Sequence, residues 1–451
     1  MAQLSTPPLS VYVHFPWCVR KCPYCDFNSY TLHGELDERR YVDALARDLE
    51  AQAAEVAGRE VVSLFFGGGT PSLFSPLGIA RVIDSARRHL RLAADIEVTM
   101  EANPGAIERG RFAEYRAAGL TRVSLGAQSF DATRLEALGR IHSPDETRRA
   151  AAELHAAGLD NFNLDLMYAL PGQDVEAAVR DVEVALAQEP AHISHYQLTI
   201  EQGTVFAAQP PALPEDDTAA DMLTACAARL AEAGFAHYEV SAYARSGRQC
   251  RHNLNYWTFG DYLGVGAGAH GKLTFPQGSP PGPPTERLAR KSPAGTTERP
   301  ATERPAREPP AGARESPAGM GWPIAPPGSA SVIRTQQLRE PRRYLSTSPA
   351  VVTRTEVVPE QLPFEFMLNA LRLVEGFEVA TFETRTGLDW ETVAGEVDAL
   401  VGRGLLLQEG TSVKPSAQGL QFLNDLLLSF MGGGRRQSAK MAGAFGLSTG
   451  F

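Results

Sequence analysis

The hydrophobic and polar positions divide the first 270 residues into short apolar runs and longer amphipathic stretches. The apolar runs lie at 11–15, 61–66, 96–101, 121–127, 162–168 and 192–198. The amphipathic, helix-like stretches lie at 37–56, 76–91, 108–118, 145–157 and 174–188. Strands that are almost continuously apolar and alternate with helices indicate a parallel sheet that is covered on both faces. The repeated units predict an α/β fold built as a full or partial parallel (β/α) barrel.

A second, smaller domain is expected near the C-terminus. The segment "LPFEFMLNALRLVEGF" predicts a helix, and further helices, a short strand and a final helix over 416–430 follow it. This order is typical of a mainly helical, winged-helix-like domain. Residues 355–431 contain twelve Asp and Glu against four Lys and Arg, so this domain would repel nucleic-acid phosphates. We therefore expect a packing module or a lid.

Composition changes abruptly between the two domains. Residues 276–330 contain 14 of the 32 prolines and the near-repeat "TERPATERP". A segment with so few large apolar residues cannot bury enough surface to fold, which predicts a disordered insertion. The expected organisation is a barrel over 1–275, the insertion over 276–331, a connecting segment with the C-terminal domain over 332–431, and a flexible tail over 432–451.

Charge and cysteine content narrow the setting in which this chain works. The formal net charge is −10, which argues against a nucleic-acid partner. No apolar run approaches the roughly 18 residues of a membrane span, and "MAQLSTPPLS" does not resemble a secretory signal. We expect a cytoplasmic protein, whose thiols are kept reduced. Clustered cysteines are then metal ligands or redox groups rather than disulfides.

Three of the five cysteines lie in "HFPWCVRKCPYC", at Cys18, Cys22 and Cys25. Three thiolates would need a fourth ligand to complete a zinc site. On a four-iron cube they would leave one iron open for a small molecule. The loop follows the first strand, at the end where barrel enzymes place their sites. A cluster, a zinc ion and unrelated thiols all remain open, whereas the isolated Cys226 and Cys250 read as small buried hydrophobes.

The spacing Cys-x3-Cys-x2-Cys, with Tyr24 before the last cysteine, resembles the radical S-adenosylmethionine (SAM) superfamily. The resemblance implies a [4Fe-4S] cluster whose open iron binds the amino and carboxylate groups of SAM. One electron then cleaves the sulfonium and gives a 5′-deoxyadenosyl radical. "FFGGGTPS", at 65–72, resembles the superfamily's glycine-rich element that holds the SAM amino group, although three glycines alone also fit a tight turn.

More of the chain resembles one branch, the oxygen-independent coproporphyrinogen III oxidases and their haem-chaperone relatives of the HemW type. "TMEANPG", "RVSLGAQSF", "GRIH" and "NFNLDLMYALPGQ" carry the likeness, which extends over roughly 10–275 and 332–431. The resemblance implies that SAM is bound near Tyr12, Gly68, Gly69, Thr70, Glu101, Gln128, Arg140 and Asp165. Glu101, Gln128 and Asp165 follow successive strands at one end, and the Arg140 fork suits a carboxylate.

Two features distinguish the members of this branch. The oxidases have the pattern Cys-x3-Cys-x2-Cys-x-Cys, with a further cysteine two positions after the third. Phe27 stands at that position in this chain, which argues against oxidase activity. "RHNLNYW" looks like the haem signature of the chaperones, with His252 as a haem ligand and Tyr256 and Trp257 as flat surfaces; the alternative is that these residues are core. The resemblance implies a chaperone that binds haem, a [4Fe-4S] cluster and SAM and delivers haem to acceptor proteins, with transient contact to membrane-bound acceptors. The alternative is a coproporphyrinogen III oxidase.

Overall fold

The computed structural model describes residues 3–56, 58–105, 110–277, 330–347 and 351–431. Most of the expected proline-rich insertion, residues 278–329, and the expected flexible tail, 432–451, lie outside the described residues. The boundaries that the sequence predicts for these segments stay predictions.

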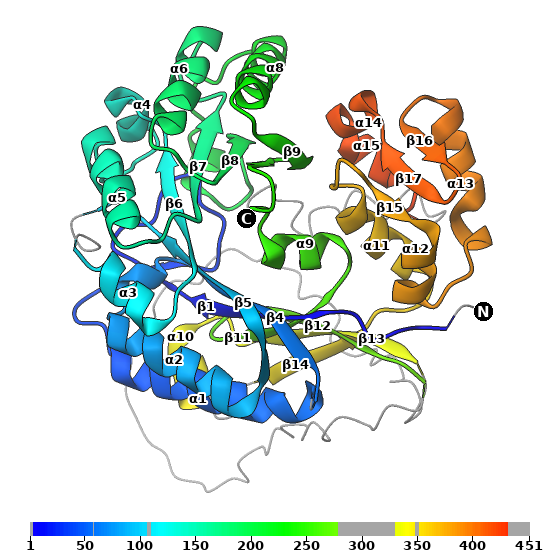
Figure 1. The fold of residues 1–451 in the computed structure, drawn as a ribbon, viewed down its shortest axis with the longest axis horizontal. Coiled ribbons are helices and arrows are strands. Elements are labelled where there is room, and N and C mark those ends of the chain that lie inside the picture. The colour runs from blue at the N-terminus through cyan, green and yellow to red at the C-terminus, as the bar shows by residue number, and fades with distance from the viewer. Residues whose placement is uncertain (1–2, 57, 106–109, 278–329, 348–350, 432–451) are drawn as a thin grey trace, which may run out of the picture.

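One sheet of twelve strands forms the centre of the molecule, in the order β14-β13-β12-β11-β1-β4-β5-β6-β7-β8-β10-β9 (Figure 1). The parallel strands are β1 (Leu9–Phe15), β4 (Glu60–Gly68), β5 (Arg91–Ala102), β6 (Arg122–Gln128), β7 (Phe162–Tyr168), β8 (His192–Gln197) and β11 (Asp261–Val265). The antiparallel strands are β9 (Ala236–Glu239), β10 (Ala242–Ala244), β12 (His270–Phe275), β13 (Ser331–Gln337) and β14 (Val351–Glu356). Since β14 and β9 end the order within the described residues, the barrel is a partial one.

The apolar runs become parallel strands because both of their faces are covered. All seven residues of β6 are buried, and in β1 only Tyr12 is partly exposed. The covering helices are α1 (Glu38–Ala53), α2 (Pro76–His89), α3 (Phe112–Ala118), α4 (Ala132–Ala137), α5 (Pro144–Ala156), α6 (Val175–Leu186) and α8 (Asp216–Glu232). Side-chain caps fix the starts of α1, α2, α4, α5 and α6, such as the capping box of Ser143 and Glu146 on α5. The predicted α/β fold with a parallel barrel is confirmed.

The shorter elements surround the two ends of the sheet. They are β2 (Trp17–Cys18), β3 (Tyr30–Thr31), α7 (Val205–Ala208), α9 (Arg251–Trp257), α10 (Pro341–Ser346) and the 3-10 turns Ala54–Val56 and Pro71–Leu73. Strands β12 and β13 pair from His270↔Gln336 to Phe275↔Ser331. The insertion therefore connects the two paired strands of a hairpin, and the chain re-enters the main sheet before it reaches the C-terminal domain.

The C-terminal domain has its own apolar core and a three-stranded sheet. Its elements are α11 (Leu362–Ala370), β15 (Phe377–Glu378), α12 (Val379–Thr386), α13 (Glu391–Gly402), β16 (Leu406–Glu409), β17 (Ser412–Pro415), α14 (Ala417–Gln421) and α15 (Leu423–Leu428). The single helix predicted over 416–430 is wrong in detail, because Phe422 leaves helical geometry, with ψ at 35°, and divides it into α14 and α15. The mainly helical, winged-helix-like arrangement is confirmed.

Helix α9 lies between the barrel and the C-terminal domain (Figure 1). From the C-terminal domain, the Arg372 guanidinium stacks 4.4 Å above the Trp257 ring of α9 and pairs with Glu239 of β9 at 3.7 Å. Arg334 of β13 also pairs with Glu365 of α11. These ion pairs are largely buried, so removing one partner of either pair would leave an uncompensated buried charge and destabilise the contact between the domains.

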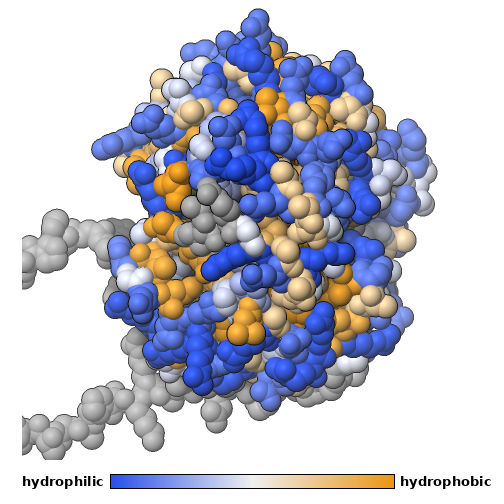
Figure 2. Space-filling model, turned by 60° about the vertical axis from the view of Figure 1, so that its left-hand side comes forward, coloured by the Kyte–Doolittle hydropathy of each residue, from blue (hydrophilic) through white to orange (hydrophobic). Residues whose placement is uncertain are grey.

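The face of the molecule shown in Figure 2 is largely hydrophilic, with apolar residues in scattered patches. Within the described chain, none of the helices has both the length and the apolar character that crossing a membrane requires. Two of the exposed large apolar side chains, Val19 and Phe27, lie on the loop that carries the three clustered cysteines, at 42% and 37% exposure. The loop therefore carries exposed apolar side chains in addition to its three cysteines.

Candidate functional site

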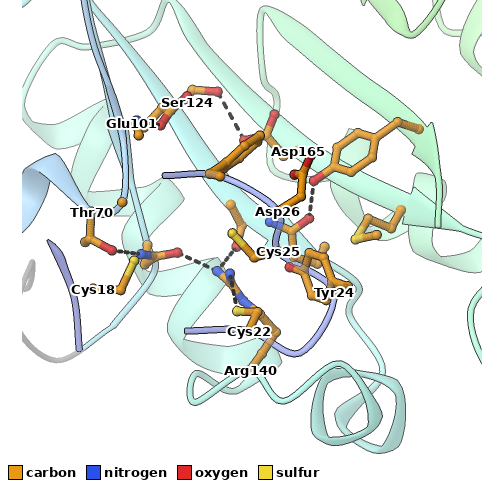
Figure 3. Close-up of a pocket in the computed structure, with 18 of the residues that line it drawn as sticks. Cys18, Cys22, Tyr24, Cys25, Asp26, Thr70, Glu101, Ser124, Arg140 and Asp165 are labelled. Carbon is orange, nitrogen blue, oxygen red and sulfur yellow. Dashed lines mark hydrogen bonds between the residues drawn. The ribbon is translucent and has the colours of Figure 1, made fainter. Parts of the chain in front are cut away.

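A pocket opens at the carboxyl ends of the parallel strands, and most of the residues that the sequence singled out line it (Figure 3). The predicted residues in its wall are Cys18, Cys22, Cys25, Gly68, Gly69, Thr70, Glu101, Gln128, Arg140 and Asp165. They come from the cysteine loop, from the carboxyl ends of β4, β5 and β6, and from the α4–α5 connection that carries Arg140, while Asp165 lies in the middle of β7 and not at its end as expected. The topology thus brings together residues that are far apart in the sequence.

The cysteine loop is held in shape by its own backbone. Short parallel strands pair Trp17 with Tyr30 and Cys18 with Thr31, which closes the base of the loop. Inside it, the Cys25 N–H donates to the Cys22 carbonyl at 3.1 Å. The Lys21 ammonium donates to the carbonyls of Phe27 and Ser29, at 2.9 and 3.1 Å. These contacts fix the path of the loop whose three cysteines line the pocket.

The three clustered thiols are chemically able to hold a cluster. All five cysteines are free thiols, and Cys18, Cys22 and Cys25 line the same pocket. On a four-iron cube each of the three would hold one iron and leave the fourth open. Burial raises the pKa of Cys18 to about 11 and also raises the pKa of Cys25. Both thiols must lose a proton when they bind metal.

The glycines after β4 are required by close packing. A Cβ atom on Gly69 would lie 2.6 Å from the Trp17 carbonyl oxygen and 2.8 Å from that of Phe15. Gly68 has a φ of 113°, and a Cβ atom there would lie 2.5 Å from the His14 ring. A side chain at either position would push the strand away from the cysteine loop. The glycine-rich segment therefore brings backbone groups up to the pocket.

Two partly buried carboxyl groups line the pocket. The Glu101 carboxylate accepts from the Gly68 N–H at 3.0 Å, and Asp165 accepts from Ser124 and Asn163 at 3.1 and 2.7 Å. Burial, and then the charge of Asp165, raise the pKa of Glu101 to about 8; burial also raises the pKa of Asp165. A cationic ligand such as a sulfonium with an amino group would relieve this repulsion, so these two residues fit SAM.

Replacing Glu101 with Gln should stabilise the ligand-free protein at alkaline pH. The folded protein keeps the Glu101 proton up to about pH 8, whereas the unfolded chain releases it near 4.5. Within this window each pH unit costs the wild type about 1.4 kcal/mol of stability, and the glutamine variant avoids that loss. Unfolding by urea at pH 5 and pH 9 would measure the effect. Equal pH dependence of the two proteins would contradict it.

Arg140 is already engaged by the protein. Its guanidinium donates to the Asn103 amide oxygen, to the Gly126 carbonyl at 3.0 Å and to the Cys22 sulfur at 3.6 Å. The Arg140 guanidinium, which we expected to bind the SAM carboxylate, therefore also orients the cysteine loop. Its contact with SAM stays a prediction.

Gln128 marks a strained point in the pocket wall. Its φ is 65°, in the left-handed region that residues other than glycine rarely adopt. The Tyr196 hydroxyl donates to its amide oxygen at 2.6 Å. This bond fixes the side chain of Gln128, so its second hydrogen-bonding group is available to a ligand.

The remaining two predicted residues, Tyr12 and His252, lie in the barrel interior and outside the lining of this pocket. The Tyr12 hydroxyl bonds to His14 Nδ1 at 2.9 Å. The His252 side chain bonds to the Ser63 hydroxyl at 3.1 Å and stacks on Phe65 at 4.8 Å. Burial lowers the pKa of His252 to about 3, so the ring is neutral at physiological pH. A haem contact by His252 stays a prediction.

Several lining residues were not singled out from the sequence. Asn103, Ser124 and Tyr196 bond to Arg140, Asp165 and Gln128, and thereby support the predicted contacts. Asn103 follows β5 directly and Tyr196 is the last residue but one of β8, whereas Ser124 lies inside β6. A position near a strand end was therefore the available indication for two of them, and polar residues there are too common to identify partners.

Comparison with known proteins agrees with this site. The radical SAM superfamily model matches residues 12–185, and the HemN C-terminal domain model matches residues 357–422. The barrel, the cysteine loop and the glycine-rich strand end thus define a radical SAM protein. "Heme chaperone HemW" of Escherichia coli strain K12 is 41% identical over 95% of this chain and 99% of its own. The chain belongs to the HemW family.

Two further relatives are consistent with this membership. "Heme chaperone HemW" of Haemophilus influenzae is 38% identical and covers 94% of this chain and 98% of its own. The solved structure of the E. coli coproporphyrinogen III oxidase HemN, titled a radical SAM enzyme, has a TM-score of 0.70 and 20% identity, over 95% of this chain and 91% of that one. That likeness shows the fold alone. The superfamily implies a [4Fe-4S] cluster and SAM, which the donor set of the pocket fits.

Proposed function

We propose that this protein is a haem chaperone, which binds haem together with a [4Fe-4S] cluster and SAM and delivers haem to acceptor proteins. The observation that carries the proposal is the 41% identity, over nearly the full length of both chains, to a protein named as a heme chaperone. Phe27 supports it, because this side chain lines the pocket at the place where the oxidases have a further cysteine. The likeness to the oxidase covers the fold and does not extend to this residue.

The residues of the pocket divide between two cofactors. Cys18, Cys22 and Cys25 would hold the cluster, and the Arg140 guanidinium would remain against the Cys22 sulfur. Glu101 and Asp165 would accept hydrogen bonds from SAM on the opposite wall. The cluster and SAM together supply one-electron chemistry when bound. The chain itself binds and orients them and surrounds them with buried polar groups.

Helix α9 carries the proposed haem contact, His252. Its first turn is anchored to the barrel, because the Glu97 carboxylate accepts from the N–H groups of Arg251 and His252 at 3.1 and 3.3 Å. The Cys250 thiol donates to the same carboxylate at 3.5 Å. His252 is only 5% exposed, so ligation of haem iron requires α9 to move away from the sheet. The neutral ring has the lone pair that such ligation needs.

We place this function in the cytoplasm, with transient contact to membrane-bound acceptors as part of the same proposal. Thiolates that must remain free for iron support a reducing compartment. The exposed apolar side chains Val19 and Phe27 on the cysteine loop support contact with another protein.

Titration with haem tests the proposal. The full chain is purified without oxygen, its cluster is reconstituted, and haem is added in steps while the absorbance is recorded. We expect one haem to bind per chain with a saturating spectral change. Incubation with coproporphyrinogen III, SAM and a reductant should leave the porphyrinogen unchanged. Formation of protoporphyrinogen IX would contradict the proposal. So would a haem absorbance spectrum that is the same with the protein as in buffer alone.

A further inference from the structure

A chain of hydrogen bonds links two of the three clustered cysteines through Asn103. The Arg140 guanidinium donates to the Cys22 sulfur and to the Asn103 amide oxygen. The Asn103 amide nitrogen donates to the Thr70 hydroxyl oxygen at 3.1 Å. Thr70 and Cys18 line the same pocket, where burial raises the pKa of the Cys18 thiol and a hydrogen bond from the Thr70 side chain opposes that shift. Figure 3 shows Cys18, Thr70, Arg140 and Cys22 on one side of the pocket.

The direction of each bond in this chain is determined by chemistry. A guanidinium has no acceptor, so Arg140 donates to both of its partners. Asn103 must then present its oxygen to Arg140 and its NH2 group to Thr70. Because the Thr70 oxygen accepts from Asn103, its own hydrogen is available to the Cys18 sulfur. The donors therefore converge on two sulfurs, one at each end of the chain.

Close packing maintains this arrangement. Gly126 leaves the room in which the side chains meet: a Cβ atom there would lie 3.2 Å from the Arg140 guanidinium and 3.4 Å from the Asn103 oxygen. Arg140 is further fixed by the Gly126 carbonyl at 3.0 Å. Asn103 follows directly on β5, which ends at Ala102. Its position is therefore set by the sheet rather than by the loop that carries the cysteines.

We propose that Asn103 is a positioning residue that sets the reduction potential of the cluster by aiming the Thr70 hydroxyl at Cys18 and the Arg140 guanidinium at Cys22. The inference rests on the proposed cluster. Hydrogen bonds to ligand sulfurs stabilise the reduced, more negative cluster and so raise its potential. Asn103 has no sulfur contact of its own and acts through its two neighbours.

The neutral substitutions Asn103→Leu and Thr70→Val test this role. Leucine removes both bonds of the amide at nearly equal size, and valine removes only the hydroxyl. Thr70→Ser keeps the hydroxyl and serves as the matched control. In an anaerobic redox titration followed by electron paramagnetic resonance, we expect the ratio of reduced to oxidised cluster at a fixed potential to fall about tenfold in both variants, equivalent to about 59 mV. Thr70→Ser should match the wild type.

The double variant Asn103→Leu/Thr70→Val decides whether the two residues act as one chain. If Asn103 works through Thr70, the shift of the double variant is smaller than the sum of the single shifts. Additive shifts, or an unchanged potential in Asn103→Leu with its iron content intact, would overturn the inference. Should the Asn103 variant not fold, Thr70→Val against Thr70→Ser tests the same hydroxyl. Absence of a four-iron cluster from the wild type would instead refute the proposed function.

Discussion

Replacing Cys22 with serine should remove nearly all of the iron and labile sulfide from the anaerobically reconstituted protein. The side chain is partly exposed on the cysteine loop, so the fold loses little, while the cluster loses one of three ligands. A serine oxygen is a far weaker ligand for iron–sulfur clusters than a thiolate. We expect the visible absorbance of the cluster to fall at least about tenfold, and SAM binding to weaken with it.

Cys226→Ser provides the matched control. Cys226 is fully buried in α8 and far from the pocket wall, so its loss should lower stability by about 1–2 kcal/mol and leave the iron content unchanged. Iron and sulfide analysis with the melting temperature of each variant separates the two effects. Full iron content in Cys22→Ser, or one zinc per chain and no iron in the wild type, would refute the assignment of the loop.

The second large effect is expected from His252→Ala. If the imidazole ligates haem iron, its loss should weaken haem binding at least about 30-fold, which is about 2 kcal/mol. The variant also loses the bond to Ser63 and the stacking on Phe65, so the free energy of unfolding should fall by about 1–3 kcal/mol. The cluster should remain, because the pocket that holds it does not include His252.

His195→Ala separates ligation from stability. His195 is as buried as His252 and stacks on Tyr168 at 4.7 Å, and burial lowers its pKa to about 4. It lies on β8, away from α9. We expect both variants to be less stable and only His252→Ala to lose haem, as measured by haem titration beside urea unfolding. Equal haem affinity in the two variants would show that His252 is a core residue, the alternative that the motif left open.

The local pattern of apolar and polar residues predicted the strands well, but it predicted the burial of individual side chains poorly. The apolar runs at 61–66 and 162–168 correspond to β4 and β7, since strands buried on both faces have an unmistakable composition. The motif around His252 indicated this histidine and its segment as a candidate haem site. It could not reveal that this ring would stack on Phe65, which lies 187 positions earlier, because that contact depends on how α9 packs against the sheet.

The same limit applies to the pocket. Glu101 and Asp165 could be expected at one end of the barrel from the strand order, and both line the same pocket, where burial and then the charge of Asp165 raise the pKa of Glu101. That Arg140 is occupied by Asn103 and Cys22 could not be foreseen, because it depends on the path of the α4–α5 connection. Hydrogen-bond partners across a pocket are set by tertiary packing, which a single sequence does not encode locally.

The most direct test of a haem chaperone is haem transfer. The reconstituted full chain is loaded with haem, freed of excess haem by gel filtration, and mixed with the haem-free form of a haem enzyme. We expect haem to remain with the chain through the column and then to restore the activity of the enzyme, while coproporphyrinogen III given with SAM and a reductant is not converted. Loss of haem on the column, no recovery of enzyme activity, or conversion of coproporphyrinogen III would contradict it.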